Sequence, residues 1–245
     1  MARFEELAWH DTRMGEISLR RRRDPSHEVD VYEVKLGDEY LMSSLFPVAE
    51  IELARLGLAA TSGDQLDVIV GGLGLGYTAR TALEDPRVAS VTVVEAFDEV
   101  ISWHRRRLLP FAEPVAADPR CHLLAGDFFA LAASDAGFDP RTPGRRHDAI
   151  LLDVDHSPSQ VLDPSHAPFY QPDGLRRLAR HLRPGGVFAL WSNDPPEVAF
   201  SDALSEVFAE TAAHVIAFPN PLQDREATNT VYVATLAEPP GAVKG

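Results

Sequence analysis

The chain has 245 residues, of which 45% are hydrophobic and 24% are charged, and its formal net charge is −14 at pH 7. This length suits one large domain with a buried core. The acidic balance argues against general nucleic-acid binding, which depends on lysine and arginine, and favours a small or cationic partner. A single cysteine excludes an internal disulfide. Because the sequence shows no signal peptide and no apolar run of membrane-spanning length, we expect a cytoplasmic protein without membrane or nucleic-acid partners.

The first 45 residues are predicted to form a small unit of β-strands. Alternating polar and apolar side chains indicate a strand at Glu16–Arg20, and β-branched residues indicate a second strand at residues 29–36. A turn at Gly37 and Asp38 then leads into a returning strand at residues 39–43. A unit of this size is too small to fold alone.

From residue 46 to residue 237, predicted strands and helices alternate. The strands are residues 66–70, 91–95, 122–125, 149–153, 186–191, 214–218 and 229–236; the helices are residues 47–62, 77–83, 98–109, 128–133, 172–182 and 195–210. Apolar strands that alternate with helices indicate a parallel sheet covered on both faces, so the fold class is a three-layer, Rossmann-like α/β sandwich. The last two strands lack a helix between them and predict a terminal antiparallel hairpin. The tail, residues 238–245, is expected to be flexible.

A glycine-rich loop between a strand and a helix is the strongest local signal. Its glycines are Gly71, Gly72, Gly74 and Gly76. Glycine lets a ligand approach the backbone closely. Glu95 stands 19 residues after Gly76, at the end of the next strand, where a carboxylate can accept hydrogen bonds from ribose hydroxyls. Asp127 ends the third strand and is placed to accept from an adenine amino group. The pattern predicts a nucleoside site.

The spacing of the glycines distinguishes between nucleoside cofactors. A dinucleotide fingerprint needs glycine at its first, third and sixth positions, but the sixth position counted from Gly72 is the bulky Tyr77. A nicotinamide or flavin cofactor is therefore disfavoured. The spacing, together with the terminal hairpin, resembles the class I S-adenosylmethionine-dependent fold.

Several motifs, in order and spacing, resemble the spermidine synthase (polyamine aminopropyltransferase) family. They are Val68–Gly76, Val93–Glu95, Gly126–Phe128, Leu151–Asp153, Phe169–Tyr170 and Leu182–Gly186. That family also has an N-terminal β unit before its nucleotide-binding sheet. The resemblance spans most of the chain, and it implies a dimer or larger assembly.

The resemblance also implies roles for individual residues. The glycine loop would lie under the nucleoside, Glu95 would hold the ribose and Asp127 would bind the adenine. Asp153 matches the first aspartate of the family's catalytic loop, which orients or deprotonates the attacking amine. Asp155 and Tyr170 are predicted to bind the substrate.

Three departures from the family pattern bear on the reaction. Gly74 stands where the family has an aspartate that holds the amino group of the aminopropyl chain. His156 replaces the second aspartate of the Asp-x-x-Asp motif, with Asp155 beside it. The family's Tyr-His-Glu stretch has no clear match around residues 44–50.

The loss of a loop aspartate at Gly74 affects the choice of donor. Decarboxylated S-adenosylmethionine carries an ammonium and no carboxylate, so a loop aspartate would attract it and repel the carboxylated donor. Without that aspartate, S-adenosylmethionine is at least as acceptable. We therefore favour methyl transfer to a small, amine-bearing acceptor. The alternatives are aminopropyl transfer from decarboxylated S-adenosylmethionine and a non-catalytic nucleoside-binding protein.

Both transfers require an amine that has lost a proton. Asp153 or His156 could accept that proton, and His166 is a weaker candidate. The spacing of Asp155, Asp163 and the two histidines matches no metal-ligand pattern, so no metal is expected.

Overall fold

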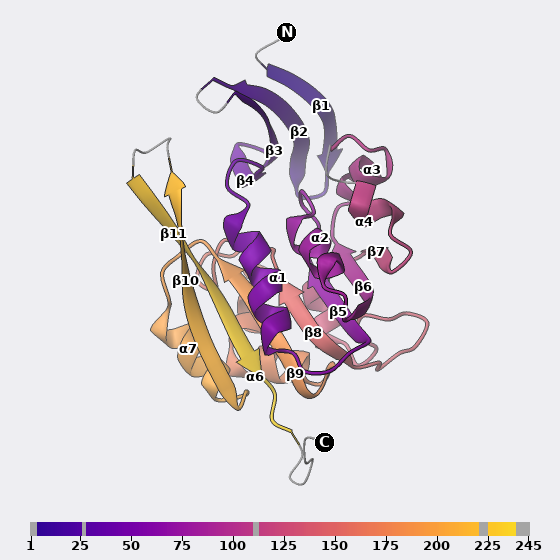
Figure 1. Ribbon diagram of the computed structural model, residues 1–245, viewed down its shortest axis with the longest axis vertical. Helices are drawn as coiled ribbons and strands as arrows, with labels where there is room; N and C mark the ends of the chain where they lie inside the picture. The colour runs from indigo at the N-terminus through magenta and orange to yellow at the C-terminus, as the bar shows by residue number, and fades with distance from the viewer. Residues whose placement is uncertain (1–3, 26–27, 110–112, 221–224, 239–245) are drawn as a thin grey trace.

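The structure is a computed structural model that describes residues 4–25, 28–109, 113–220 and 225–238 (Figure 1). Except for Glu238, the predicted flexible tail lies outside these residues. The amino-terminal strands form an antiparallel sheet in the order β1-β2-β3-β4. Their bounds are β1 (Phe4–Thr12), β2 (Gly15–Asp24), β3 (Val29–Leu36) and β4 (Glu39–Ser43). The predicted β unit thus contains a strand, β1, that the sequence pattern did not reveal.

The second sheet has seven strands in the order β10-β11-β9-β8-β5-β6-β7. Their bounds are β5 (Leu66–Gly71), β6 (Val88–Glu95), β7 (Cys121–Ala125), β8 (His147–Leu152), β9 (Leu182–Ser192), β10 (Glu210–Asn220) and β11 (Arg225–Thr235). Strands β5 to β9 pair in parallel, whereas β11 pairs antiparallel with both β9 and β10. The predicted α/β fold with a terminal antiparallel hairpin is confirmed.

Helices cover both faces of this sheet. Consecutive strand residues point to opposite faces: Val68 and Val70 join one hydrophobic core, and Ile69 joins the other. The first core is covered by α1 (Val48–Ala60), α2 (Tyr77–Glu84), α3 (Asp98–Arg105) and α4 (Glu113–Ala117). The second is covered by α5 (Phe128–Ala133), the 3-10 helix η1 (Pro164–Tyr170), α6 (Pro172–Ala179) and α7 (Val198–Ser205). Within the described residues, no helix has the length and apolar character needed to cross a membrane.

The small sheet lies above the carboxyl ends of the parallel strands (Figure 1). Its buried side chains Ile17, Leu19 and Val34 belong to the same core as Leu53 of α1 and Trp103 of α3. Because the two sheets share this core, the small sheet can form a fixed wall over the strand ends. The division of the chain at residue 45 remains our proposal for the domain boundary.

Two helices end four or more residues before the sequence prediction. Helix α3 stops at Arg105, because Arg107 adopts a left-handed conformation (φ 56°) and the Leu108 N–H bonds the Trp103 carbonyl. This is a Schellman ending without its usual glycine. The helix predicted to extend to residue 210 stops at Ser205, because the Ala209 N–H already bonds the carbonyl of Thr235.

Candidate active site

A cavity of about 440 Å³ opens at the carboxyl ends of the parallel strands, beneath the small sheet. This volume falls within the range of small-molecule sites. Six predicted site residues line it: Gly72, Gly74, Glu95, Asp127, Asp153 and His156. Four others do not line it: Gly71, Gly76, Asp155 and Tyr170. Parallel strands therefore bring most of the predicted residues together at one edge of the sheet, as expected for a doubly wound fold.

Glu95 holds the glycine loop against the end of β6. Its Oε2 accepts the Leu73 N–H at 2.9 Å, and its Oε1 accepts the Phe97 N–H at 2.9 Å. Burial raises the pKa of Glu95, and the backbone hydrogen bonds oppose that rise. Each carboxylate oxygen has a second lone pair with which to accept a ribose hydroxyl. Ribose binding by Glu95 remains a prediction, and the structure adds a role in shaping the loop.

Gly72 and Gly74 of the loop both have positive φ angles, a conformation that glycine adopts most readily. Gly72 has φ +92°, and a Cβ at this position would overlap the carbonyl oxygen of Asp153. Gly74 has φ +44°, and its carbonyl oxygen accepts a hydrogen bond from His104 Nε2 at 2.9 Å. Burial lowers the pKa of His104, which keeps the ring neutral. Nothing in the sequence pattern connects His104 with this loop, because a histidine that ends a helix next to arginines has an ordinary electrostatic explanation.

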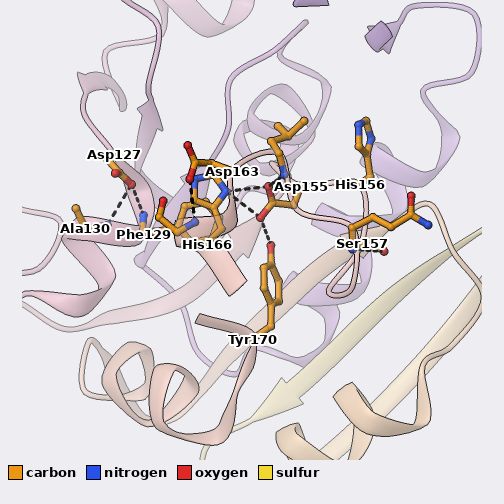
Figure 2. Close-up of polar contacts among 12 residues, drawn as sticks. Asp127, Phe129, Ala130, Asp155, His156, Ser157, Asp163, His166 and Tyr170 are labelled. Carbon is orange, nitrogen blue, oxygen red and sulfur yellow. Dashed lines mark hydrogen bonds and ion pairs between the residues drawn. The ribbon is translucent and has the colours of Figure 1, made fainter. Parts of the chain in front are cut away.

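Asp127 is the N-cap of α5. Its Oδ1 accepts the N–H groups of Phe129 at 2.9 Å and Ala130 at 3.1 Å (Figure 2). In the part of the chain that the structure describes, Oδ2 has no hydrogen-bond partner. Asp127 also lines the cavity. The cap therefore orients the carboxylate and leaves one oxygen to accept from a ligand, as adenine binding would need.

Two carboxylates, Glu50 and Asp153, face the same cavity. Asp153 follows β8, and its Oδ2 accepts the Thr78 hydroxyl at 2.8 Å. Burial raises the pKa of Asp153 to about 6, against the opposing effect of Thr78. Burial and the neighbouring charge of Asp153 raise the pKa of Glu50 to about 8. At neutral pH the two neighbouring carboxyl groups therefore hold about one proton between them.

Glu50 was not identified from the sequence. It lies in the first turn of α1, where the buried residues Glu50, Leu53, Ala54 and Gly57 recur at helical spacing. A glutamate inside an apolar helical stripe is the signal that could have identified it, because burial of an unpaired charge is costly. The energetic cost of burying this carboxylate is explained if it binds a ligand.

Replacing Glu50 by glutamine is expected to stabilise the ligand-free protein at pH 8. The pKa of Glu50 rises from 4.5 to about 8 on folding, so the folded protein keeps a proton that the unfolded chain has released. The free energy of unfolding therefore falls as pH rises through this window. Glutamine removes this pH dependence. We therefore expect the free energy of unfolding of the variant to exceed that of wild type by about 2 kcal/mol or more at pH 8.

Urea denaturation at pH 5, 6.5 and 8 measures this effect. Glu52→Gln is the matched control, because Glu52 lies on the same helix and only pairs with Arg55 at the surface. A constant difference between Glu50→Gln and wild type across these pH values would contradict a buried, protonated Glu50.

The segment after Asp153 is organised around Asp155, which is 3% exposed. Its carboxylate accepts hydrogen bonds from the Leu162 N–H at 2.8 Å, the Tyr170 hydroxyl at 2.7 Å and His166 Nδ1 at 2.9 Å (Figure 2). Burial and the charge of Asp155 raise the pKa of Tyr170 well above its usual value, so its hydroxyl stays a donor. This geometry gives Asp155 and Tyr170 a role in holding the loop, and substrate binding by either residue remains a prediction.

His156 lies at the rim of the cavity. Its Nε2 is 2.8 Å from Oε1 of Glu39, at the start of β4, so it ties the loop to the small sheet. Acceptance of the amine proton by His156 remains a prediction. Within the described ranges, no three histidine, cysteine, aspartate or glutamate side chains form a group that could hold a metal ion.

Comparison with known proteins gives sequence relatives of two kinds. The chain is 29% identical over 164 residues to polyamine aminopropyltransferase 2 of Pseudomonas aeruginosa, a match that covers 63% of this chain and 43% of that protein. It is 30% identical over 143 residues to putrescine N-methyltransferase 3 of Nicotiana tabacum, covering 58% of this chain and 33% of that protein. The chain thus matches less than half the length of these relatives. No family model matches it.

Solved structures show the same fold across nearly the whole chain. Spermidine synthase from Thermotoga maritima superposes with a TM-score of 0.70 at 16% identity, covering 96% of this chain and 74% of that one. A spermidine synthase in complex with the transition-state analogue AdoDATO gives a TM-score of 0.71, also at 16% identity, covering 96% and 75%. The chain is therefore similar in sequence to polyamine aminopropyltransferases and putrescine N-methyltransferases, and it has the same fold as these spermidine synthases.

Proposed function

We propose that the protein transfers an alkyl group from a sulfonium nucleoside to a small amine. The observation that carries the proposal is that one cavity joins Glu95 and Asp127, suited to a nucleoside, with the Glu50–Asp153 pair, suited to an amine. The names of the sequence relatives support the same chemistry, since one kind transfers an aminopropyl group and the other methylates putrescine.

The donor would supply an activated carbon bound to positively charged sulfur. The lone pair of the amine attacks this carbon, a C–N bond forms, the C–S bond breaks, and the electron pair leaves with the neutral thioether. The protein holds the two reactants in line and excludes water. Asp153 accepts the proton that the amine must lose. Its raised pKa of about 6 makes it a better base near neutral pH than an ordinary aspartate.

The surroundings of Asp153 suit a cationic acceptor. Glu50 adds a second carboxylate, and its retained proton can leave when an ammonium enters the cavity. Trp191 also lines the cavity, and an indole face attracts ammonium groups. The acceptor class we infer is therefore a small primary amine or diamine.

Methyl transfer from S-adenosylmethionine is the favoured form of the reaction. The glycine loop places no carboxylate at Gly74 to select the ammonium of the decarboxylated donor. Arg13, in the turn between β1 and β2, lines the cavity and offers a cation to a carboxylated donor. Aminopropyl transfer is the second candidate, and the observation that favours it is Glu50, a buried carboxylate able to bind the ammonium that the decarboxylated donor carries.

A turnover assay with putrescine and each donor in turn tests the proposal. We expect product from S-adenosylmethionine at a higher kcat/KM than from the decarboxylated donor. The reverse preference would establish aminopropyl transfer. Binding of both thioether products without turnover of any amine would instead support the non-catalytic alternative.

Gly74→Asp should move the donor preference toward the decarboxylated donor by about tenfold, because the new carboxylate attracts its ammonium and repels the carboxylate of S-adenosylmethionine. Aspartate tolerates the left-handed conformation at this position, and a side chain there needs Met42 Sδ, 2.8 Å from the new Cβ, to move. Gly74→Asn is the matched control, with the same shape and no charge. An equal shift in both variants would show that shape, and not charge, sets the preference.

A further inference from the structure

His166 presents one face of its ring to an aromatic neighbour and its edge to the cavity. The ring stacks on Phe129, with centroids 3.8 Å apart and planes inclined by 20°. Phe129 is also one of the two residues whose N–H groups bond Asp127. Figure 2 shows His166 between Asp127 and Asp155. Asp127, the carboxylate predicted to bind the base, and His166 therefore both contact Phe129, one at its backbone N–H and the other at its ring.

The hydrogen bonds of Asp155 determine which nitrogen of His166 carries the proton. Asp155 accepts from Leu162 and Tyr170, and its two oxygens lie 2.9 and 3.2 Å from His166 Nδ1. Because a carboxylate only accepts, Nδ1 donates and carries a hydrogen. In the neutral ring, Nε2 is then an acceptor.

The second nitrogen, Nε2, is open to a ligand. His166 lines the cavity, its side chain is 12% exposed, and Nε2 has no hydrogen-bond partner among the described residues. Asp155, which Tyr170 holds in place, bonds Nδ1, and Phe129 stacks on one face of the ring, so the direction of Nε2 is fixed. A ring fixed on two sides with one free acceptor is suited to recognition.

Two acceptors, Asp127 Oδ2 and His166 Nε2, belong to residues that line the same cavity, and an exocyclic amino group has two hydrogens to donate. We propose that His166 is a specificity-determining residue for the donor base: it accepts the second hydrogen of the adenine amino group, while Asp127 accepts the first. This inference rests on the proposed function, because it assumes a nucleoside in the cavity. A hypoxanthine base places a carbonyl oxygen at the same position, and that oxygen would face the Nε2 lone pair.

The test compares the affinities of 5′-methylthioadenosine and 5′-methylthioinosine by isothermal titration calorimetry. Both probes lack the amino-acid or aminopropyl portion, so the result does not depend on the group transferred. His166→Phe keeps an aromatic ring against Phe129 and removes the acceptor. We expect it to weaken binding of the adenosine compound about tenfold and to leave the affinity for the inosine compound unchanged or higher, because the Nε2 lone pair no longer faces the carbonyl oxygen.

His166→Gln is the rescue variant, because its amide oxygen can take the place of Nε2. It should recover most of the preference for adenosine, and thermal unfolding of each variant checks that it is folded. Equal affinity losses for both probes in His166→Phe, or no change in their ratio, would overturn the inference and leave the proposed function intact. Binding of neither probe by the wild type would overturn the proposed function, and this inference with it.

Discussion

Asp153→Asn is expected to lower kcat at least a hundredfold while the affinity for a nucleoside thioether stays within about threefold of wild type. The amide keeps the shape of the carboxylate but cannot accept a proton, and loss of a general base typically costs 10²- to 10⁴-fold. We expect nucleoside affinity to be preserved because Asp153 lies beside Thr78 and Glu50, where we propose that the amine binds, and not among the residues proposed to hold the nucleoside. Single-turnover kinetics measures the chemical step, and calorimetry with S-adenosylhomocysteine measures binding.

Asp163→Asn is the matched control. Asp163 lies in the same segment and lines the same cavity, but its Oδ1 accepts the Ser165 N–H as the cap of η1, a bond that asparagine can also accept. We expect this variant to keep nearly full activity. Wild-type turnover in Asp153→Asn would show that the proton leaves by another route, such as His156.

The pattern of the sequence predicted most of the large sheet because its strands are buried on both faces. Leu66–Gly71 and His147–Leu152 are short apolar runs between glycines and polar turns, which is how central parallel strands are recognised. The same reasoning failed at β1. Phe4–Thr12 is an edge strand of the small sheet with mostly exposed or half-buried side chains, so its pattern carries little hydrophobic signal.

The positions of the site residues were predictable where they follow strands, since parallel strands end at one edge. Glu95, Asp127 and Asp153 meet at the cavity for this reason. The direction of loop side chains was not predictable. Asp155 stands two residues after Asp153, yet it points into the protein, because three donors brought by residues 162, 166 and 170 surround it. Only the folded loop brings these donors together.

Glu95→Gln is expected to weaken the binding of a nucleoside thioether by about tenfold to a hundredfold. Glu95 accepts two backbone hydrogen bonds, from Leu73 and from Phe97, one on each oxygen. Glutamine can accept on its single oxygen, and its amide nitrogen must then face the other N–H, which loses its partner. An unsatisfied buried donor costs about 1–3 kcal/mol, and the loop beneath the nucleoside shifts with it. Because glutamine has one oxygen where glutamate has two, the variant would also have fewer acceptors for the ribose hydroxyls.

Calorimetry with 5′-methylthioadenosine and denaturation by urea measure the two parts of this effect. Glu39→Gln is the control, because Glu39 is an exposed carboxylate that contacts His156 at the rim and does not line the cavity. It should bind the nucleoside like wild type. If Glu95→Gln lost stability but kept full nucleoside affinity, Glu95 would serve only to shape the loop, and the ribose would have to be held by the backbone of the glycine loop itself.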